Sequence, residues 1–127
     1  MFRVKMNKYL AQFAEVLILR STGSCNFFGL ESKGRKQIRG NGVLVLTTQE
    51  LCFQMYLPTR EWRIPLSSIT SIETPKSHLG KTKFRPLLMV KFINNEGLPD
   101  SIAWWILELD KWVKDIQQAR EKAKSSF

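Results

Sequence analysis

The feature that most constrains the fold is a change of hydrophobic period near residue 105. Before that point, short β-rich runs recur at intervals of about ten residues, a spacing typical of antiparallel barrels and sandwiches. After it, apolar residues recur with a period of about 3.6, which places them on one face of a helix. That face holds Trp105, Leu109, Trp112, Val113 and Ile116. The pattern predicts a mainly β domain that ends in one amphipathic α-helix.

Seven segments fit strands because apolar and polar residues alternate in them or because they form short apolar runs. They are residues 15–20, 43–48, 51–57, 60–66, 69–74, 86–93 and 100–105. We expect about seven antiparallel strands in two packed sheets, capped by the C-terminal helix over an open end. Residues 1–13 fit a short N-terminal helix, and residues 120–127 are expected to fray.

The size and the apolar content fit a single domain spanning residues 1–127. No apolar run approaches the roughly 18–20 residues of a membrane span, and no signal peptide is recognisable. The basic, acid-free start leaves an organelle presequence open as an alternative. Cys25 and Cys52 match no zinc or redox spacing, so we expect reduced thiols in a cytoplasmic protein, with peripheral membrane contact as an option.

The excess positive charge is confined to two acid-free windows. The net charge is +9, and the windows 32–49 and 74–95 contain four and five basic residues. They are Lys33, Arg35, Lys36 and Arg39, and then Lys76, Lys81, Lys83, Arg85 and Lys91. Such a footprint favours an anionic partner, either an acidic lipid, a nucleic acid or an acidic protein surface. The alternative is that the charge serves only solubility.

Two segments resemble the pleckstrin-homology-like superfold, in particular its GRAM and bacterial PH-like branches. Residues 40–53 (GNGVLVLTTQELCF) followed by 63–73 (RIPLSSITSIE) are similar to the GRAM pattern of paired strands. Residues 109–119 (LDKWVKDIQQA) resemble the closing helix with its core tryptophan, here Trp112, followed by Ile116. The resemblance implies a PH-like barrel that binds lipids or proteins and seldom catalyses a reaction. Residues 21–39 depart from the family pattern, since they are longer and more basic.

Residues 29–36 and 75–82 nearly match the sequence of a phosphate-binding P-loop. Neither segment has the flanking secondary structure that a P-loop requires. The motif needs a preceding strand and a following helix N-terminus, and β-rich runs follow both segments. The single histidine, His78, lies in the basic connection, and no Cys, His and acid set has ligand spacing. We therefore expect no enzyme, no metal and no cofactor.

The two basic windows are the candidate site. In a simple antiparallel meander, the connections 1–2, 3–4 and 5–6 share one end, and the acids Glu96 and Asp100 fall at the other. The predicted anion-binding or lipid-binding residues are Lys33, Arg35, Lys36, Arg39, Arg60, Lys76, Lys81, Lys83 and Arg85. At the tip of the first connection we expect Phe27, Phe28 and Leu30 to contact a membrane.

The functional prediction is a binding module that engages anionic lipid or phosphoinositide headgroups. A protein–protein adaptor is the alternative, working through an open sheet edge or the helix face and marked by an exposed Trp104 or Trp105. Nucleic-acid binding ranks third, because aromatic residues do not alternate with the basic ones along a strand. The sequence leaves the partner and the oligomeric state open.

Overall fold

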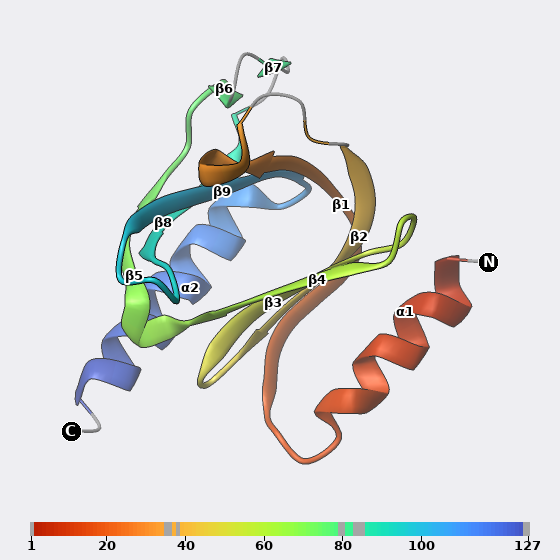
Figure 1. The fold of residues 1–127 in the computed structure, drawn as a ribbon. Coiled ribbons are helices and arrows are strands. Elements are labelled where there is room, and N and C mark those ends of the chain that lie inside the picture. The colour runs from red at the N-terminus through yellow and green to blue at the C-terminus, as the bar shows by residue number, and fades with distance from the viewer. Residues whose placement is uncertain (1, 35–36, 38, 79–80, 83–85, 126–127) are drawn as a thin grey trace.

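The computed structural model describes residues 2–34, 37, 39–78, 81–82 and 86–125. Its helical elements are α1 (Phe2–Leu10), η1 (Ala11–Phe13), η2 (Glu31–Lys33), η3 (Leu66–Ser68) and α2 (Leu109–Ser125). Its strands are β1 (Ile18–Leu30), β2 (Gly40–Thr47), β3 (Glu50–Met55), β4 (Arg60–Pro65), β5 (Ile69–Glu73), β6 (Ser77–His78), β7 (Lys81–Thr82), β8 (Leu88–Ile93) and β9 (Pro99–Ile106). The molecule is mainly β, with a C-terminal helix (Figure 1).

Seven strands form one antiparallel sheet in the order β4-β3-β2-β1-β9-β8-β5, and the short β6 and β7 form a separate hairpin. The two packed sheets expected from the sequence are two halves of this one sheet. They are joined by β1, which is 13 residues long and pairs with β2 on one side and with β9 on the other. Within the described residues the sheet is not closed, since β4 and β5 are its edges.

Bulges in β1 allow the sheet to bend over on itself. The register with β2 shifts between Thr22 and Cys25, and the register with β9 shifts between Phe27 and Gly29. Gly29 has a φ of 116°, a conformation that side chains disfavour. The bend brings the two half-sheets face to face around the main core (Figure 1).

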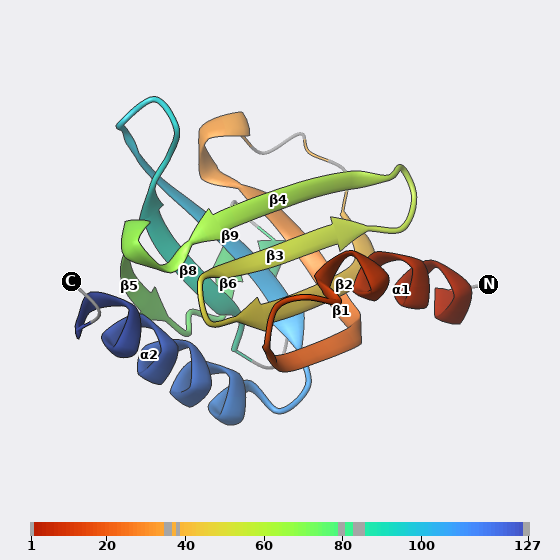
Figure 2. The same cartoon turned by 90° about the horizontal axis from the view of Figure 1, so that it is seen from below.

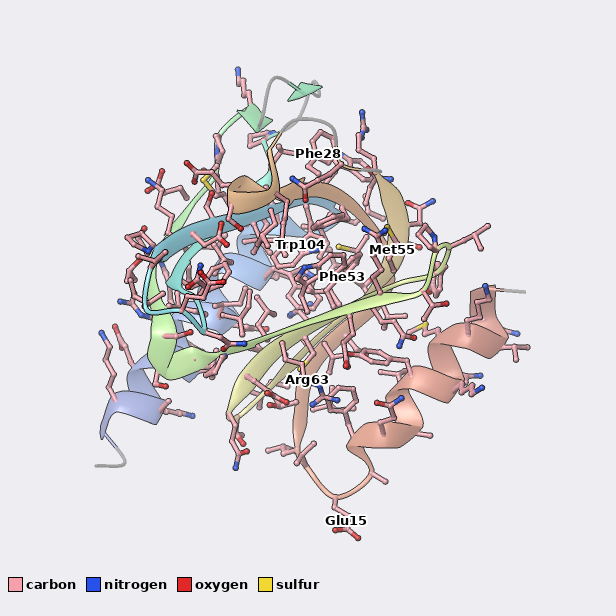
Figure 3. The ribbon with its side chains drawn as sticks, in the orientation of Figure 1. Glu15, Phe28, Phe53, Met55, Arg63 and Trp104 are labelled. Atoms are coloured by element: carbon pink, nitrogen blue, oxygen red, sulfur yellow. The ribbon has the colours of Figure 1, made fainter. Side chains whose placement is uncertain are left out.

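Aromatic rings fill that core. Phe27 stacks on Trp62 with ring centroids 4.5 Å apart, and Phe53 lies 5.7 Å from the ring of Trp104. Figure 3 shows Phe53 and Trp104 between the two halves of the sheet. The helix α2 completes the core with Trp112 and Ile116.

The sequence prediction for the C-terminal helix needs two corrections. Trp105 belongs to β9, and the helical face that meets the core begins at Leu109. Residues 120–125, expected to fray, are helical up to Ser125. Ala123 packs on the core and Arg120 Nη2 donates a hydrogen bond to the Thr70 carbonyl, so this last part of the helix is held against β5.

The helix expected in residues 1–13 is present as α1 and η1, and it covers the outer face of β2 and β3 (Figures 1 and 2). Tyr9 and Phe13 pack there with Val43, Val45 and Cys52. Since Leu44, Leu46 and Phe53 point into the main core, β2 and β3 are buried on both faces. None of the described helices is both long and apolar enough to cross a bilayer.

Candidate anion-binding face

The first basic connection is anchored to the end of β1 by Gln37. Its side chain accepts a hydrogen bond from the Leu30 backbone nitrogen at 2.9 Å and donates one to the Leu30 carbonyl at 2.6 Å. This pair of bonds mimics a strand partner and holds the connection close to the sheet. Lys33 and Arg39 flank this anchor and are both exposed. Arg35 and Lys36, predicted to bind anions, lie outside the described residues.

The expectation that Phe27, Phe28 and Leu30 form an exposed tip is wrong. All three are buried, because β1 continues through them instead of turning. Phe27 and Leu30 belong to the main core, and Phe28 points to the opposite, outer face of the sheet. Figure 3 shows Phe28 on the outer side of β1, away from Phe53 and Trp104. These residues are therefore part of the fold and are not available to enter a membrane.

Phe28 instead contacts one residue from each basic window. The guanidinium carbon of Arg39 lies 4.1 Å from the centre of the Phe28 ring, a cation–π contact. On the same face Phe28 packs with Leu87 and Ala103, and the half-buried Met89 and Trp105 border them. We call Phe28, Leu87, Ala103, Met89 and Trp105 the outer cluster.

The second basic segment reaches the outer cluster through its two ends. Leu87 donates a backbone hydrogen bond to the Pro75 carbonyl at 2.7 Å, which closes the segment at its base. Lys76 follows Pro75 and is exposed. The hairpin of β6 and β7 projects above this base at the top of Figure 1. Lys83 and Arg85 lie outside the described residues, and for Lys81 only the backbone, in β7, is described.

Arg60 extends the basic surface toward the turn between β3 and β4. It is exposed and pairs across the ladder with Met55, which in turn pairs with Gly42 of β2. The connections 1–2 and 3–4 are therefore neighbours, as expected for a meander. We call the exposed cations Lys33, Arg39, Arg60 and Lys76 the basic face.

The expected location of the acids at the opposite end is wrong for Asp100. Because β9 runs antiparallel to β1, the start of β9 lies beside the end of β1, where Leu30 pairs with Ile102. The Asp100 carboxylate accepts a hydrogen bond from the Ser32 backbone nitrogen at 2.9 Å. Asp100 is buried, so its carboxylate braces the first connection and does not face the solvent.

The tryptophans occupy the core more than the surface. Trp104 and Trp112 are buried, and Trp62 is half-buried against Phe27. Trp105 is half-buried in the outer cluster. Exposed apolar side chains lie close together at residues 16–19. There Leu17 and Leu19 line a groove of about 270 Å³ against Asp115, Gln118, Ala119 and Lys122 of α2.

Both thiols of the chain are buried, and burial opposes their ionisation. Cys25 and Cys52 are both free and buried, and burial raises the pKa of each thiol above the ordinary value of 9.0. A protonated thiol is a poor nucleophile and a poor metal ligand. In the part of the chain that the structure describes, no group of three or more His, Cys, Asp or Glu residues is placed to hold a metal ion.

No protein-family model matches the chain, and the curated proteins contain no significant match. Among solved structures, it is similar to the C-terminal domain of an unknown protein from Leishmania infantum. The TM-score is 0.65 at 20% identity, over 94% of this chain and 98% of that one. It is also similar to a chain of the 8S snRNP assembly intermediate, with a TM-score of 0.59 at 11% identity over 85% and 82% of the two chains. At these identities the similarity concerns the fold alone.

Proposed function

We propose that this chain is a non-catalytic, cytoplasmic binding module of PH-like type that engages anionic lipid headgroups at a membrane surface through the basic face. One observation carries the proposal. Arg39 from the first basic window and Leu87 from the second both pack on Phe28. Residues of the two windows that hold the excess charge are thus neighbours on the outer side of one half-sheet.

The charges of the basic face are available to a ligand. Lys33, Arg60 and Lys76 are exposed, and none of the described carboxylates forms an ion pair with them. Arg39 is held over Phe28, and its Nη2 donates a long hydrogen bond of 3.5 Å to the Asn26 side chain. A guanidinium fixed in this way presents its remaining N–H groups to a phosphate at little cost in side-chain entropy.

The strand order and the C-terminal helix support the PH-like resemblance seen in the sequence. β1 belongs to both half-sheets: β2, β3 and β4 follow it on one side, and β9, β8 and β5 follow it on the other. The helix α2 closes the core between them. Fold similarity does not determine a ligand. The argument for lipid therefore rests on the charge distribution.

Charge reversal on the basic face tests the proposal. Each cation near an anionic bilayer contributes about 1 kcal/mol, so replacing Lys33, Arg39, Arg60 and Lys76 by Glu should weaken vesicle binding by at least about a thousandfold. Sedimentation with phosphatidylcholine vesicles containing phosphatidylserine or phosphoinositide measures it. Competition by soluble inositol hexakisphosphate separates headgroup recognition from binding to the bilayer surface.

A control with the same net charge separates location from total charge. It replaces four exposed lysines of α2, Lys111, Lys114, Lys122 and Lys124, by Glu. This variant should lose much less affinity than the basic-face variant. Equal losses in both variants, or a wild-type protein that ignores anionic vesicles, would contradict the proposal.

Protein binding is a second candidate function, and the groove at Leu17 and Leu19 favours it. The Leu17 side chain is 66% exposed, and the groove is lined by the apolar Ala119 as well. A partner bound there would depend little on salt, because apolar burial is not screened. Substituting Leu17 and Leu19 by Asp should leave vesicle binding unchanged if lipid is the ligand of the basic face.

A further inference from the structure

Phe27, Phe28 and Leu30 are buried, so they cannot provide the apolar side chains that would enter a bilayer next to the basic face. The described residues include two other large apolar side chains with very high exposure. Leu57, in the turn between β3 and β4, is 77% exposed, and Val4, on α1, is 70% exposed. They are the two most exposed side chains of this kind among the described residues.

These two side chains belong to elements that touch each other. Lys5 Nζ donates a hydrogen bond to the Tyr56 carbonyl at 3.1 Å, which ties the residue after Val4 to the residue before Leu57. Met6 of α1 packs in the same cluster as Tyr56. Figures 1 and 2 both place the start of α1 and the turn between β3 and β4 at the same end of the molecule.

The turn also borders the basic face. A Cβ atom on Gly40 would lie 3.6 Å from the Leu57 carbonyl oxygen, so Leu57 is next to the residue that follows Arg39. Arg60 begins β4 immediately after the turn. Leu57 therefore lies between two cations of the basic face.

The chain segments that contain or adjoin Leu57 and Val4 are rich in basic residues. The segments 2–14, 32–49 and 51–60 contain eight basic residues and no Asp or Glu. Glu61, which follows Arg60, accepts hydrogen bonds from the Tyr9 hydroxyl and Arg63 Nε, so its carboxylate is already paired. Glu15, the first acid of the chain, lies at the far end of the molecule from Phe28 (Figure 3).

We propose that Leu57, with Val4 beside it, enters the boundary between headgroups and acyl chains of an anionic bilayer. This inference rests on the proposed function and replaces the apolar contact expected from the sequence. The occupant is a bilayer because exposed apolar side chains ringed by cations match an apolar interior beneath anionic headgroups. Other exposed leucines lack such a ring: Leu17 borders the groove with Asp115, and Leu98 follows the turn that contains Glu96.

A fluorescent label tests the depth of Leu57 directly. Cys25 and Cys52 are fully buried, so a thiol-reactive, environment-sensitive dye will modify a cysteine introduced by Leu57→Cys. With anionic vesicles, the emission of this label should shift to the blue and be quenched by lipids that are brominated in the acyl chain. Leu98→Cys provides the control, since Leu98 is also exposed, at 55%, and its label should stay in water.

Affinity provides the second measurement. Leu57→Glu should weaken binding to phosphatidylserine vesicles by about tenfold to a hundredfold, the effect of losing one well-buried leucine. Leu98→Glu carries the same charge change and should leave the affinity unchanged. A wild-type protein that does not bind these vesicles would overturn both the proposed function and this inference. Charge-dependent binding with a Leu57 label that stays in water would overturn this inference alone.

Discussion

Gly42 sets how closely β2 and β3 approach each other beside the basic face. A Cβ atom at this position would lie 2.2 Å from the Gln54 carbonyl oxygen and 2.7 Å from the Phe53 ring. The carbonyl belongs to a strand paired on both sides, so it has little freedom to move. A side chain at residue 42 would push β3, and with it the turn that carries Leu57, away from β2.

Gly42→Ala is therefore expected to destabilise the fold by about 3 kcal/mol, the upper part of the range for overpacking. Urea unfolding followed by tryptophan fluorescence measures the change. Gly34→Ala is the matched substitution: its Cβ would meet nothing within 4 Å, and only its φ of 79° opposes a side chain. That backbone conformation costs about 1 kcal/mol. An equal decrease in the free energy of unfolding in both variants would contradict the close approach of β2 and β3 at Gly42.

Phe27 and Phe28 are buried although the sequence predicts them at an exposed tip, and the cause is physical. The run before them, Ser21–Asn26, is small and polar and contains Gly23, a composition typical of a turn. Tertiary pairing overrides that preference, because this stretch pairs with β2 along one edge and, from Cys25, with β9 along the other. The positive charge of the neighbouring Lys33 and Arg39 could be predicted from the sequence, since it depends on the residue type and not on the backbone conformation.

At the scale of elements, α1 acts as a cover for the outer face of β2 and β3. Tyr9 and Phe13 pack over Cys52, and the Tyr9 hydroxyl donates a hydrogen bond to Glu61 Oε2 at 2.7 Å. Burial in this interface is the main cause that raises the pKa of the Cys52 thiol above 9.0. The reactivity of Cys52 therefore reports whether α1 is docked.

Replacing Tyr9 and Phe13 by Ala should release α1 and make Cys52 reactive toward an aromatic disulfide reagent near pH 8. Exposure to water lowers the thiol pKa toward its ordinary value, so the thiolate fraction rises. Cys25, which lies in the main core, should stay unreactive. Replacing the exposed Lys8 and Gln12 by Ala is the control and should leave both thiols protected. An unreactive Cys52 in the Tyr9 and Phe13 variant would contradict this role of α1.

Strands with a strict hydrophobic pattern were the predictable elements. β4 and β8 lie within two residues of the segments expected from the sequence, because their alternation and bounding turns are local signals. The continuation of β1 from residue 20 to Leu30 and the extension of α2 to Ser125 depend on contacts between residues distant in the chain. No local sequence pattern predicts such contacts. The hairpin of β6 and β7 is only two residues a strand, too short for a periodic pattern.

At the scale of the whole molecule, the location of the candidate site depended on which strand β1 pairs with. The meander assumed from the sequence does not specify that β1 also pairs with β9. It therefore put Asp100 at the end of the sheet opposite the first basic connection. The observed β1–β9 pairing brings Asp100 under Ser32 and aligns Gly40, Phe27, Trp104 and Leu88 in one row across four strands. Both basic connections adjoin this row, which is how charges far apart in the sequence come to share one face.

The two sides of the molecule differ in chemistry as a result. The outer cluster lies on the outer side of one half-sheet, the basic face borders it and extends to β4 through Arg60, and the groove at Leu17 lies against α2. In our account the first surface meets lipid and the second does not. Beside the groove, the charge of Arg20 is paired with Asp115. Equal binding of one anionic ligand to both surfaces would therefore contradict an explanation based on charge.

The most direct test is a map of the membrane-facing residues. Wild-type protein is bound to anionic bicelles with a nitroxide on the lipid headgroup, and the loss of each backbone amide signal is recorded by nuclear magnetic resonance. We expect the strongest losses at Arg39, Leu57 and Lys76, and little loss at Leu17 and Leu98. Losses centred on Leu17 or Leu98, or spread evenly over the chain, would contradict the claim that the basic face is the lipid-binding surface.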